Sequence, residues 1–264
     1  MITSDTSVFG YLMPAGTSTK LVNLYSRFID ADPSATVVPL ATRKECLESA
    51  VHNVRTGLIQ GMLVDKALYS DISSLVDAVT KEAIVSGVID TIFADPHTGT
   101  LVGDCVAVKA ITAMTSYIET IKDPLVMLYC DCWETRVVMT ALSGRVTMME
   151  VVADPSEAMD SIPTGCVVEY TGNEPSDSEP FDLVVNPPEP FEPAENQHKL
   201  AFTVDQPPIS GQAVTFEALR LAYSIGKFRS LSEQICLEAA KTYEKICSLY
   251  KQGVSERTRL CPAS

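Results

Sequence analysis

Apolar and polar residues alternate along the first part of the chain with periods that predict strands followed by helices. Apolar runs at Ser7–Met13 and Ala35–Leu40 predict strands, and apolar positions three and four residues apart predict helices at Thr19–Ile29 and Lys44–Arg55. The same reading predicts a strand at Leu58–Val64, a helix at Ile72–Val85, and a hairpin of Ile89–Ala94 and Thr100–Val102.

A second series of strands and helices follows a helix predicted at Val106–Ile121. The predicted strands are Leu125–Cys130, Val146–Val152, Val167–Tyr170, Leu183–Val185 and Leu200–Val204, and the predicted helices are Glu134–Leu142, Thr215–Ser224 and Leu231–Leu249. Alternating strands and helices favour an α/β fold with mainly parallel sheets.

Length and charge limit the class of protein. A chain of 264 residues is long enough for two modest domains. A net charge of -14 repels phosphate backbones and anionic headgroups, so we expect a small-molecule ligand or a protein partner, and neither nucleic acid nor membrane. A homodimer is kept as an alternative assembly. The N-terminus carries no basic segment leading into an apolar core, so we expect a cytoplasmic protein.

Cysteine usage favours reduced thiols. The eight cysteines are scattered through a chain rich enough in aliphatic residues to build an ordinary core. Cys130 and Cys132, with Cys105 as a third candidate, lack the paired spacing of a structural zinc site. We therefore expect no metal.

Three stretches carry a resemblance to one enzyme family. They are Phe9-Gly-Tyr-Leu-Met-Pro-Ala-Gly-Thr-Ser18, Gln60-Gly-Met-Leu-Val-Asp-Lys66, and Gly87-Val-Ile-Asp-Thr-Ile92 followed by Leu101-Val-Gly103. In order and spacing they resemble the shikimate dehydrogenase family. The resemblance implies a substrate domain at 1–108 completed by 231–255, a Rossmann-like domain at 109–230, and terminal helices that pack back on the first domain. It also implies a substrate cleft between the domains.

The resemblance implies which residues stand at the family's catalytic positions, and one of them differs from the family's residue. Lys66 matches the family's catalytic lysine, but Ala107 stands at the position of its aspartate partner. An alanine methyl can neither orient an ammonium nor accept a proton. If Lys66 and Asp90 line one cleft, they form a new lysine–carboxylate pair able to bind a polar or cationic ligand or to transfer a proton.

The family's substrate-binding positions also depart. By resemblance they fall on Ser18, Gln60, Thr91 and Glu238, while a second family serine is replaced by Gly16. The added carboxylates of Asp90 and Glu238 make capture of an anionic ring acid less favourable, because unpaired like charges in a cleft cost free energy.

The expected cofactor loop differs most. A dinucleotide's diphosphate needs glycines after the first strand of its domain, but this chain has Tyr129-Cys-Asp-Cys-Trp-Glu134 there. Asp154 stands where the family places its 2'-phosphate-binding arginine, and Asp182-Leu-Val-Val-Asn186 resembles a further family motif. Asp154 and Asn186 are the remaining candidates for cofactor contacts. We expect no cofactor, with NAD(P) as the alternative.

Three functions follow from these observations. The first is a pseudoenzyme or repurposed protein that binds a small polar molecule without redox catalysis. The second is an active NAD(P)-dependent oxidoreductase on a small hydroxy or keto acid related to shikimate. The third is a structural or regulatory partner subunit. The missing glycines and Ala107 favour the first.

Overall fold

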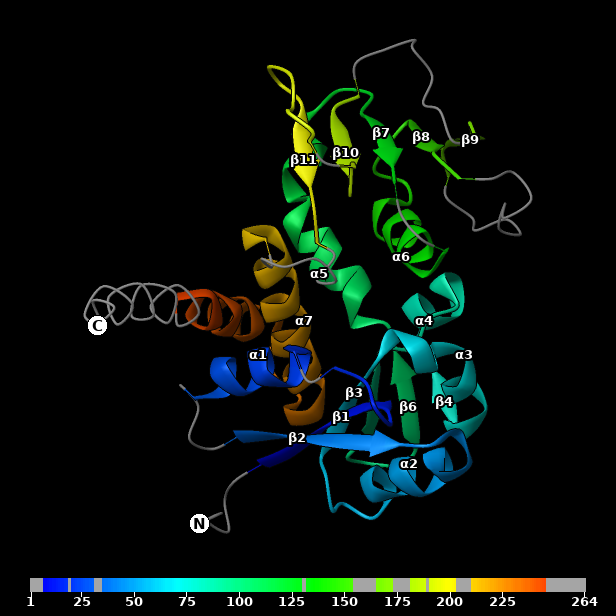
Figure 1. The fold of residues 1–264 in the computed structure, drawn as a ribbon, viewed down its shortest axis with the longest axis vertical. Helices are drawn as coiled ribbons and strands as arrows, with labels where there is room; N and C mark the ends of the chain where they lie inside the picture. Colours follow the sequence, from blue (N-terminus) through cyan, green and yellow to red (C-terminus); the bar gives the residue numbers. More distant parts are fainter. Residues whose placement is uncertain are drawn as a thin grey trace, which may run out of the picture. The chain divides into compact units, whose positions relative to one another are not determined.

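The computed structural model describes residues 7–18, 20–30, 35–129, 132–153, 165–172, 181–188, 190–202 and 210–245. Within them the chain forms two compact units (Figure 1). The first comprises 7–78, 91–102 and 217–245, and the second comprises 79–90 and 103–216. Compared with the predicted domains, the first unit gains 217–230 and loses 79–90 and 103–108.

A mixed sheet of six strands, in the order β2-β1-β3-β5-β6-β4, forms the base of the first unit. β1 (Ser7–Pro14) lies between β2 (Ala35–Thr42) and β3 (Gly61–Val64) and is parallel to both. β5 (Thr91–Ala94) runs antiparallel to β3. β6 (Leu101–Asp104) follows β5 in the predicted hairpin, where the Asp95 N–H donates to the Thr100 carbonyl. The carboxyl end of β3 and the amino end of β5 therefore share one edge of the sheet.

Helices cover both faces of this sheet (Figure 1). α1 (Lys20–Ile29) and α7 (Gly211–Arg229) cover one face, where Tyr11 packs on Tyr25 of α1 and Phe9 on Phe228 of α7 at ring distances of 5.6 and 5.1 Å. The other face is covered by η1 (Lys44–Cys46) and α2 (Leu47–Arg55).

The terminal helices pack on the first unit, as predicted. The last described helix covers residues 233–245, and its Tyr243 stacks on Phe28 of α1 at 5.7 Å. Burying these aromatic side chains stabilises the return of the chain end by roughly 2 kcal/mol each.

The helix predicted at Ile72–Val85 is wrong. The segment from Tyr69 onward contains α3 (Tyr69–Ile72), η3 (Ser73–Leu75), β4 (Ala78–Val79) and α4 (Lys81–Ser86). Backbone pairing interrupts the helix, because the Asp77 N–H donates to the Leu101 carbonyl and the Thr80 N–H to the Gly103 carbonyl. The Thr80 hydroxyl then caps α4 by accepting from the Ala83 N–H. Local periodicity could not predict pairing with a strand so far along the chain.

The second unit is built on a parallel sheet with a topological switch point. Its strands are β7 (Leu125–Leu128), β8 (Met148–Val151), β9 (Val167–Tyr170), β10 (Leu183–Val185) and β11 (His198–Leu200). Their order is β11-β10-β7-β8-β9, and all four neighbouring pairs are parallel. The strand order reverses between β7 and β10, the position where doubly wound sheets bind ligands.

Helices of the second unit begin close to their predicted residues. α5 (Val106–Met114) begins where the helix Val106–Ile121 was predicted but ends at Met114, and η4 (Ser116–Thr120) follows it. α6 (Cys132–Leu142) begins just before its predicted start at Glu134. β9 and β10 have their predicted bounds, whereas β11 was predicted at Leu200–Val204 and begins earlier. The His198 N–H donates to the Asp182 carbonyl, which draws this segment into the ladder with β10.

Gly61 should not tolerate a side chain. A Cβ at Gly61 would overlap the ring of Phe228, which packs on β3 from α7. We expect Gly61→Ala to lower the free energy of unfolding by about 1–3 kcal/mol through overpacking, measured by urea denaturation. Gly211→Ala is the control, since none of the described side chains lies within 4 Å of a Cβ there. Equal stability of the two variants would contradict this packing.

Candidate functional site

Three of the predicted site residues belong to one edge of the first sheet. Lys66 begins η2 (Lys66–Leu68), directly after β3, and Ser18 follows β1, which is parallel to β3. Thr91 begins β5, and its register partner is Leu63 near the end of β3. We call Ser18, Asp65, Lys66 and Thr91 the edge site. Carboxyl ends of parallel strands are common positions for ligands in α/β folds.

The backbone around Lys66 is fixed by its neighbour Asp65. One Asp65 oxygen accepts from the Ala67 N–H at 3.0 Å, which caps η2, and the other accepts from the Tyr11 hydroxyl at 2.8 Å. The Asp65 N–H donates to the Leu12 carbonyl at 2.8 Å. Lys66 itself is exposed. The edge site therefore presents a solvent-accessible lysine on a hydrogen-bonded base.

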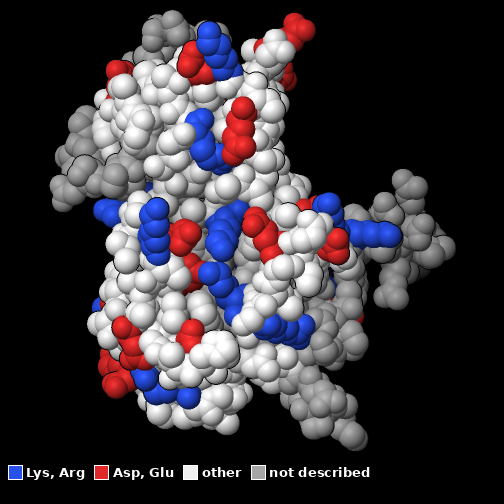
Figure 2. Space-filling model, turned by 180° about the vertical axis from the view of Figure 1, so that it is seen from behind, with Lys and Arg blue, Asp and Glu red and all other residues white. Residues whose placement is uncertain are grey.

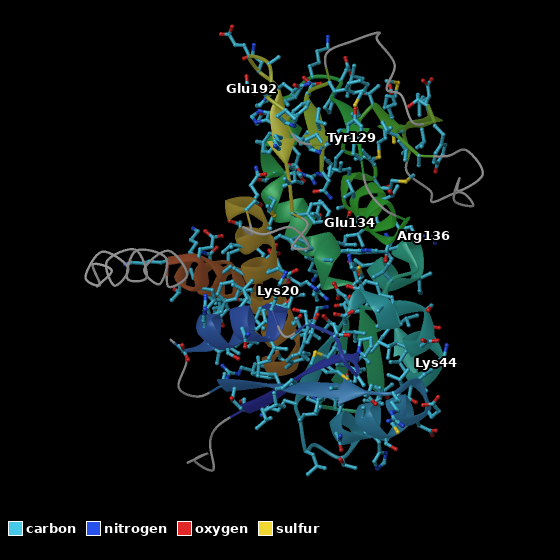
Figure 3. All side chains as sticks on the ribbon, in the orientation of Figure 1. Lys20, Lys44, Tyr129, Glu134, Arg136 and Glu192 are labelled. Carbon is cyan, nitrogen blue, oxygen red and sulfur yellow. The ribbon has the colours of Figure 1, made fainter. Side chains whose placement is uncertain are left out.

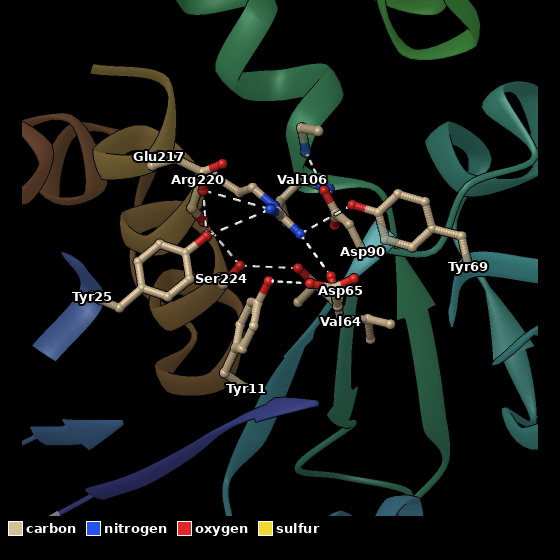
Figure 4. Close-up of polar contacts among 12 residues, drawn as sticks. Tyr11, Tyr25, Val64, Asp65, Tyr69, Asp90, Val106, Glu217, Arg220 and Ser224 are labelled. Atoms are coloured by element: carbon tan, nitrogen blue, oxygen red, sulfur yellow. Dashed lines mark hydrogen bonds and ion pairs between the residues drawn. The ribbon is translucent and has the colours of Figure 1, made fainter. Parts of the chain in front are cut away.

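A buried charged cluster lies beneath this edge, and Figure 4 shows how it connects α7 to α1 and β3. The Arg220 guanidinium donates to the Val64 carbonyl at 2.9 Å and to the Tyr69 hydroxyl at 3.2 Å. It also lies 3.5 Å from the Glu217 carboxylate, which accepts a short hydrogen bond from the Tyr25 hydroxyl. Glu217 and Arg220 are 2% and 4% exposed, so their ion pair compensates charges that are almost completely buried. We call Tyr25, Val64, Tyr69, Glu217 and Arg220 the arginine cluster.

The phenols in this region stay protonated. Burial raises the pKa of Tyr25 well above its ordinary value, and the Glu217 carboxylate adds to the shift against the opposing effect of Arg220. Burial likewise raises the pKa of Tyr11, with a further contribution from Asp65. Both hydroxyls therefore act as hydrogen-bond donors to carboxylates at physiological pH.

Thr91 and Asp90 are both fully buried. The Thr91 hydroxyl lies 2.9 Å from that of Ser224 on α7. In the second unit, the two Asp90 oxygens accept from the Val106 and Ala107 N–H groups at 2.9 and 2.8 Å. These N–H groups open α5, so Asp90 supplies the negative charge that a helix N-terminus favours. Lys66 belongs to the first unit and Asp90 to the second, and their pairing stays a prediction.

Gln60 and Glu238 belong to other segments of the first unit than Lys66. Gln60 precedes β3, so the length of that strand separates it from Lys66, and its N–H donates to the Val8 carbonyl. Glu238 is exposed in the helix at 233–245 and accepts from the Gln234 amide at 3.1 Å. Their predicted substrate contacts stay predictions.

The switch point of the second unit contains a carboxylate. Figure 3 shows Glu134 on α6 and Tyr129 just after β7. Glu134 is 4% exposed in the first turn of α6 and accepts from the Asn186 side-chain amide at 3.1 Å. Asn186 directly follows β10, and its side-chain oxygen accepts from the Phe202 N–H at 3.0 Å. The hydrogen bond between Glu134 and Asn186 therefore joins α6, the helix that follows β7, to the end of β10.

The described residues at the switch point do not fit a dinucleotide's diphosphate. A diphosphate needs bare backbone at the start of the helix, and the buried Glu134 carboxylate already supplies negative charge there. No glycine occurs between Leu125 and Leu142 to let a phosphate approach the backbone. Asp154, the other predicted cofactor residue, lies outside the described residues.

Sequence reasoning missed the arginine cluster. Glu217 and Arg220 are three residues apart on a helix whose neighbouring positions are mostly buried and apolar. Two opposite charges at helical spacing within such a stretch were the available signal, because a buried ion needs a partner.

Other functional classes receive no support from the part of the chain that the structure describes. It contains no group of three or more potential metal ligands, and Cys46, Cys105, Cys166 and Cys236 are free thiols. None of its helices is both long and apolar enough to span a bilayer. Basic and acidic side chains are interspersed on the face shown in Figure 2.

Comparison by sequence returned nothing: no protein-family model and no curated protein matches the chain. Comparison by structure returned matches along nearly the whole chain. A shikimate 5-dehydrogenase-like protein is 14% identical with a TM-score of 0.65, covering 92% of this chain and 99% of its own. The ligand-free 5-ketofructose reductase of Gluconobacter is 13% identical with a TM-score of 0.69, covering 92% and 100%.

A third similar structure contains ligands. It is the shikimate 5-dehydrogenase of Listeria monocytogenes in complex with shikimate and NAD, 14% identical with a TM-score of 0.64, covering 91% of this chain and 98% of its own. At these identities the likeness shows the fold. The chain therefore has the fold of the shikimate dehydrogenase-like proteins, as the sequence motifs predicted.

Proposed function

We propose that the chain binds a small polar molecule at the edge site, through Lys66 and Ser18, and does not carry out nicotinamide-dependent redox chemistry. The observation that carries the proposal is the buried Glu134 carboxylate, hydrogen-bonded to Asn186 at the switch point. The lysine can still bind a polar ligand. The carboxylate at the switch point disfavours a diphosphate, which is also negatively charged.

Lys66 supports the choice of a polar ligand. Its ammonium is solvent-accessible, and hydrogen bonds of Asp65 and Arg220 hold the backbone on its N-terminal side. An ammonium donates charge-assisted hydrogen bonds to the oxygens of a ligand. In the Listeria monocytogenes relative, the same fold is seen with shikimate bound.

Asp90 enters the proposal as a structural residue. Both of its oxygens accept backbone N–H groups of α5, so a role as proton acceptor would sacrifice the hydrogen bonds that begin this helix. Lys66 is the group left to transfer a proton, since Ala107 stands where the resembled family has its aspartate.

A second candidate function is an active oxidoreductase. NAD is present in the Listeria monocytogenes structure, so the fold accommodates a dinucleotide when its switch point allows it. A measurement of NAD(P) binding distinguishes the oxidoreductase from the protein that binds a ligand without redox chemistry. A co-purifying protein would favour a third function, that of a structural or regulatory subunit.

We expect NAD+ and NADP+ to leave the melting temperature unchanged at about 1 mM, because a ligand that does not bind the native state adds no stability. Thermal shift measures this directly, with the Listeria monocytogenes enzyme as positive control for NAD. A dissociation constant tighter than about 1 mM for either nucleotide would favour the oxidoreductase.

Removing the Lys66 ammonium should remove ligand binding. In a thermal-shift screen of small cyclic hydroxy acids and polyols, including shikimate, we expect compounds that stabilise the wild type to bind Lys66→Ala at least about tenfold more weakly. Lys122→Ala is the control, an exposed lysine of the second unit with the same charge change. Unchanged binding by Lys66→Ala, or no binding compound in the screen, would count against the proposal.

The arginine cluster should be essential for the fold beneath the edge site. Arg220→Met leaves the Glu217 carboxylate buried without its cation, so we expect the free energy of unfolding to fall by about 3–5 kcal/mol in urea denaturation. The double variant Glu217→Gln/Arg220→Met should recover part of that loss, since the buried Glu217 carboxylate is replaced by a neutral amide. A loss below about 1 kcal/mol for Arg220→Met would contradict the cluster's role.

A further inference from the structure

A pocket of about 220 Å³ lies in the first unit, between α2 and the segment that connects η3 to β4. Its polar lining residues include Glu48, His52, Arg55, Ser74 and Asp77. α2 covers the face of the sheet opposite α1 and α7, so this pocket is separate from the arginine cluster (Figure 1). We propose that it is a second ligand site, which binds a small carboxylate bearing a hydroxyl or ammonium group.

Arg55 is the anchor of the proposed site. One guanidinium nitrogen donates to Asp77 at 2.9 Å, and the other Asp77 oxygen accepts from the Leu101 N–H at 2.9 Å. The hydrogen bond from Arg55, and then that from Leu101, lowers the pKa of Asp77, so the carboxylate stays ionised. Asp77 thereby orients the guanidinium, whose other nitrogens make no hydrogen bond to the described residues. An oriented guanidinium with donors to spare is suited to a carboxylate.

The pocket has a basic end at Arg55 and an acidic end at Glu48. Glu48, His52 and Arg55 lie at helical spacing on the face of α2 that lines the pocket. Glu48 is about two turns from Arg55, so it can accept a hydrogen bond from a hydroxyl or ammonium at the far end of a ligand. Val51 and Leu101, both buried, provide apolar surface between these ends.

The volume sets the size of the ligand. Pockets for drug-sized molecules measure roughly 300–1,000 Å³, so 220 Å³ suits a smaller molecule with a short carbon chain. A carboxylate at one end, an apolar stem and a donor at the other end match the lining. 4-Aminobutyrate has these features, and butyrate and n-butylamine each lack one charged end. This site does not depend on the edge site or on the proposed function.

The test is a titration of the full chain with these three probes, followed by amide NMR. We expect 4-aminobutyrate to cause saturable shifts of amides in 47–55 and 74–77 at concentrations up to about 20 mM, while butyrate binds at least about tenfold more weakly and n-butylamine does not bind. Shifts that do not saturate, or that are spread evenly over the spectrum, would overturn the proposal.

Variants assign the binding to the pocket. Arg55→Gln should weaken 4-aminobutyrate binding at least about tenfold, and Arg43→Gln, with the same charge change outside the pocket lining, should not. Glu48→Gln should weaken 4-aminobutyrate but not butyrate. Each variant's amide spectrum shows whether it is folded, and if folded Arg55→Gln binds like the wild type, the site is disproved. Lys66→Ala should bind 4-aminobutyrate normally, so failure of the edge site leaves this result unaffected.

Discussion

Arg220 connects the parts of the first unit on which the edge site depends. Its guanidinium bonds the carbonyl that ends β3, the Tyr69 hydroxyl beyond η2, and the Glu217 carboxylate on its own helix. Glu217 in turn accepts from Tyr25, which brings α1 into the same network. Because both charges are almost completely buried, the cluster forms only when α1, α7 and β3 are all in place. The position of the chain just before Lys66 is therefore set by residues distant in sequence.

The two units carry opposite indications about chemistry. In the first, an exposed lysine directly follows a parallel strand. In the second, the switch point of a parallel sheet contains a buried acid bonded to Asn186. A fold supports many functions, and the groups at its sites decide among them. These groups are the basis of the proposal that the chain binds a ligand without a nicotinamide cofactor.

Local patterns predicted the fold well and the buried charges poorly. β9 and β10 have their predicted bounds because each is a short apolar or alternating run between turn residues. The helix predicted at Ile72–Val85 failed because β4 pairs with β6, a contact between distant segments. Lys66 was predicted from a motif, and its role stays a prediction. Arg220 and Glu217 were not predicted, since their partners Val64 and Tyr25 come from other elements. Asp90 was predicted to act in chemistry, and its hydrogen bonds to α5 became apparent only in three dimensions.

We propose that the Glu134 carboxylate occupies the place where a diphosphate would bind. A crystal structure grown with excess NADP+ tests it most directly. We predict that the hydrogen bond between Glu134 and Asn186 is retained and that no nucleotide lies at the carboxyl ends of β7 and β10. A diphosphate bound at the start of α6, with Glu134 displaced from Asn186, would contradict the account.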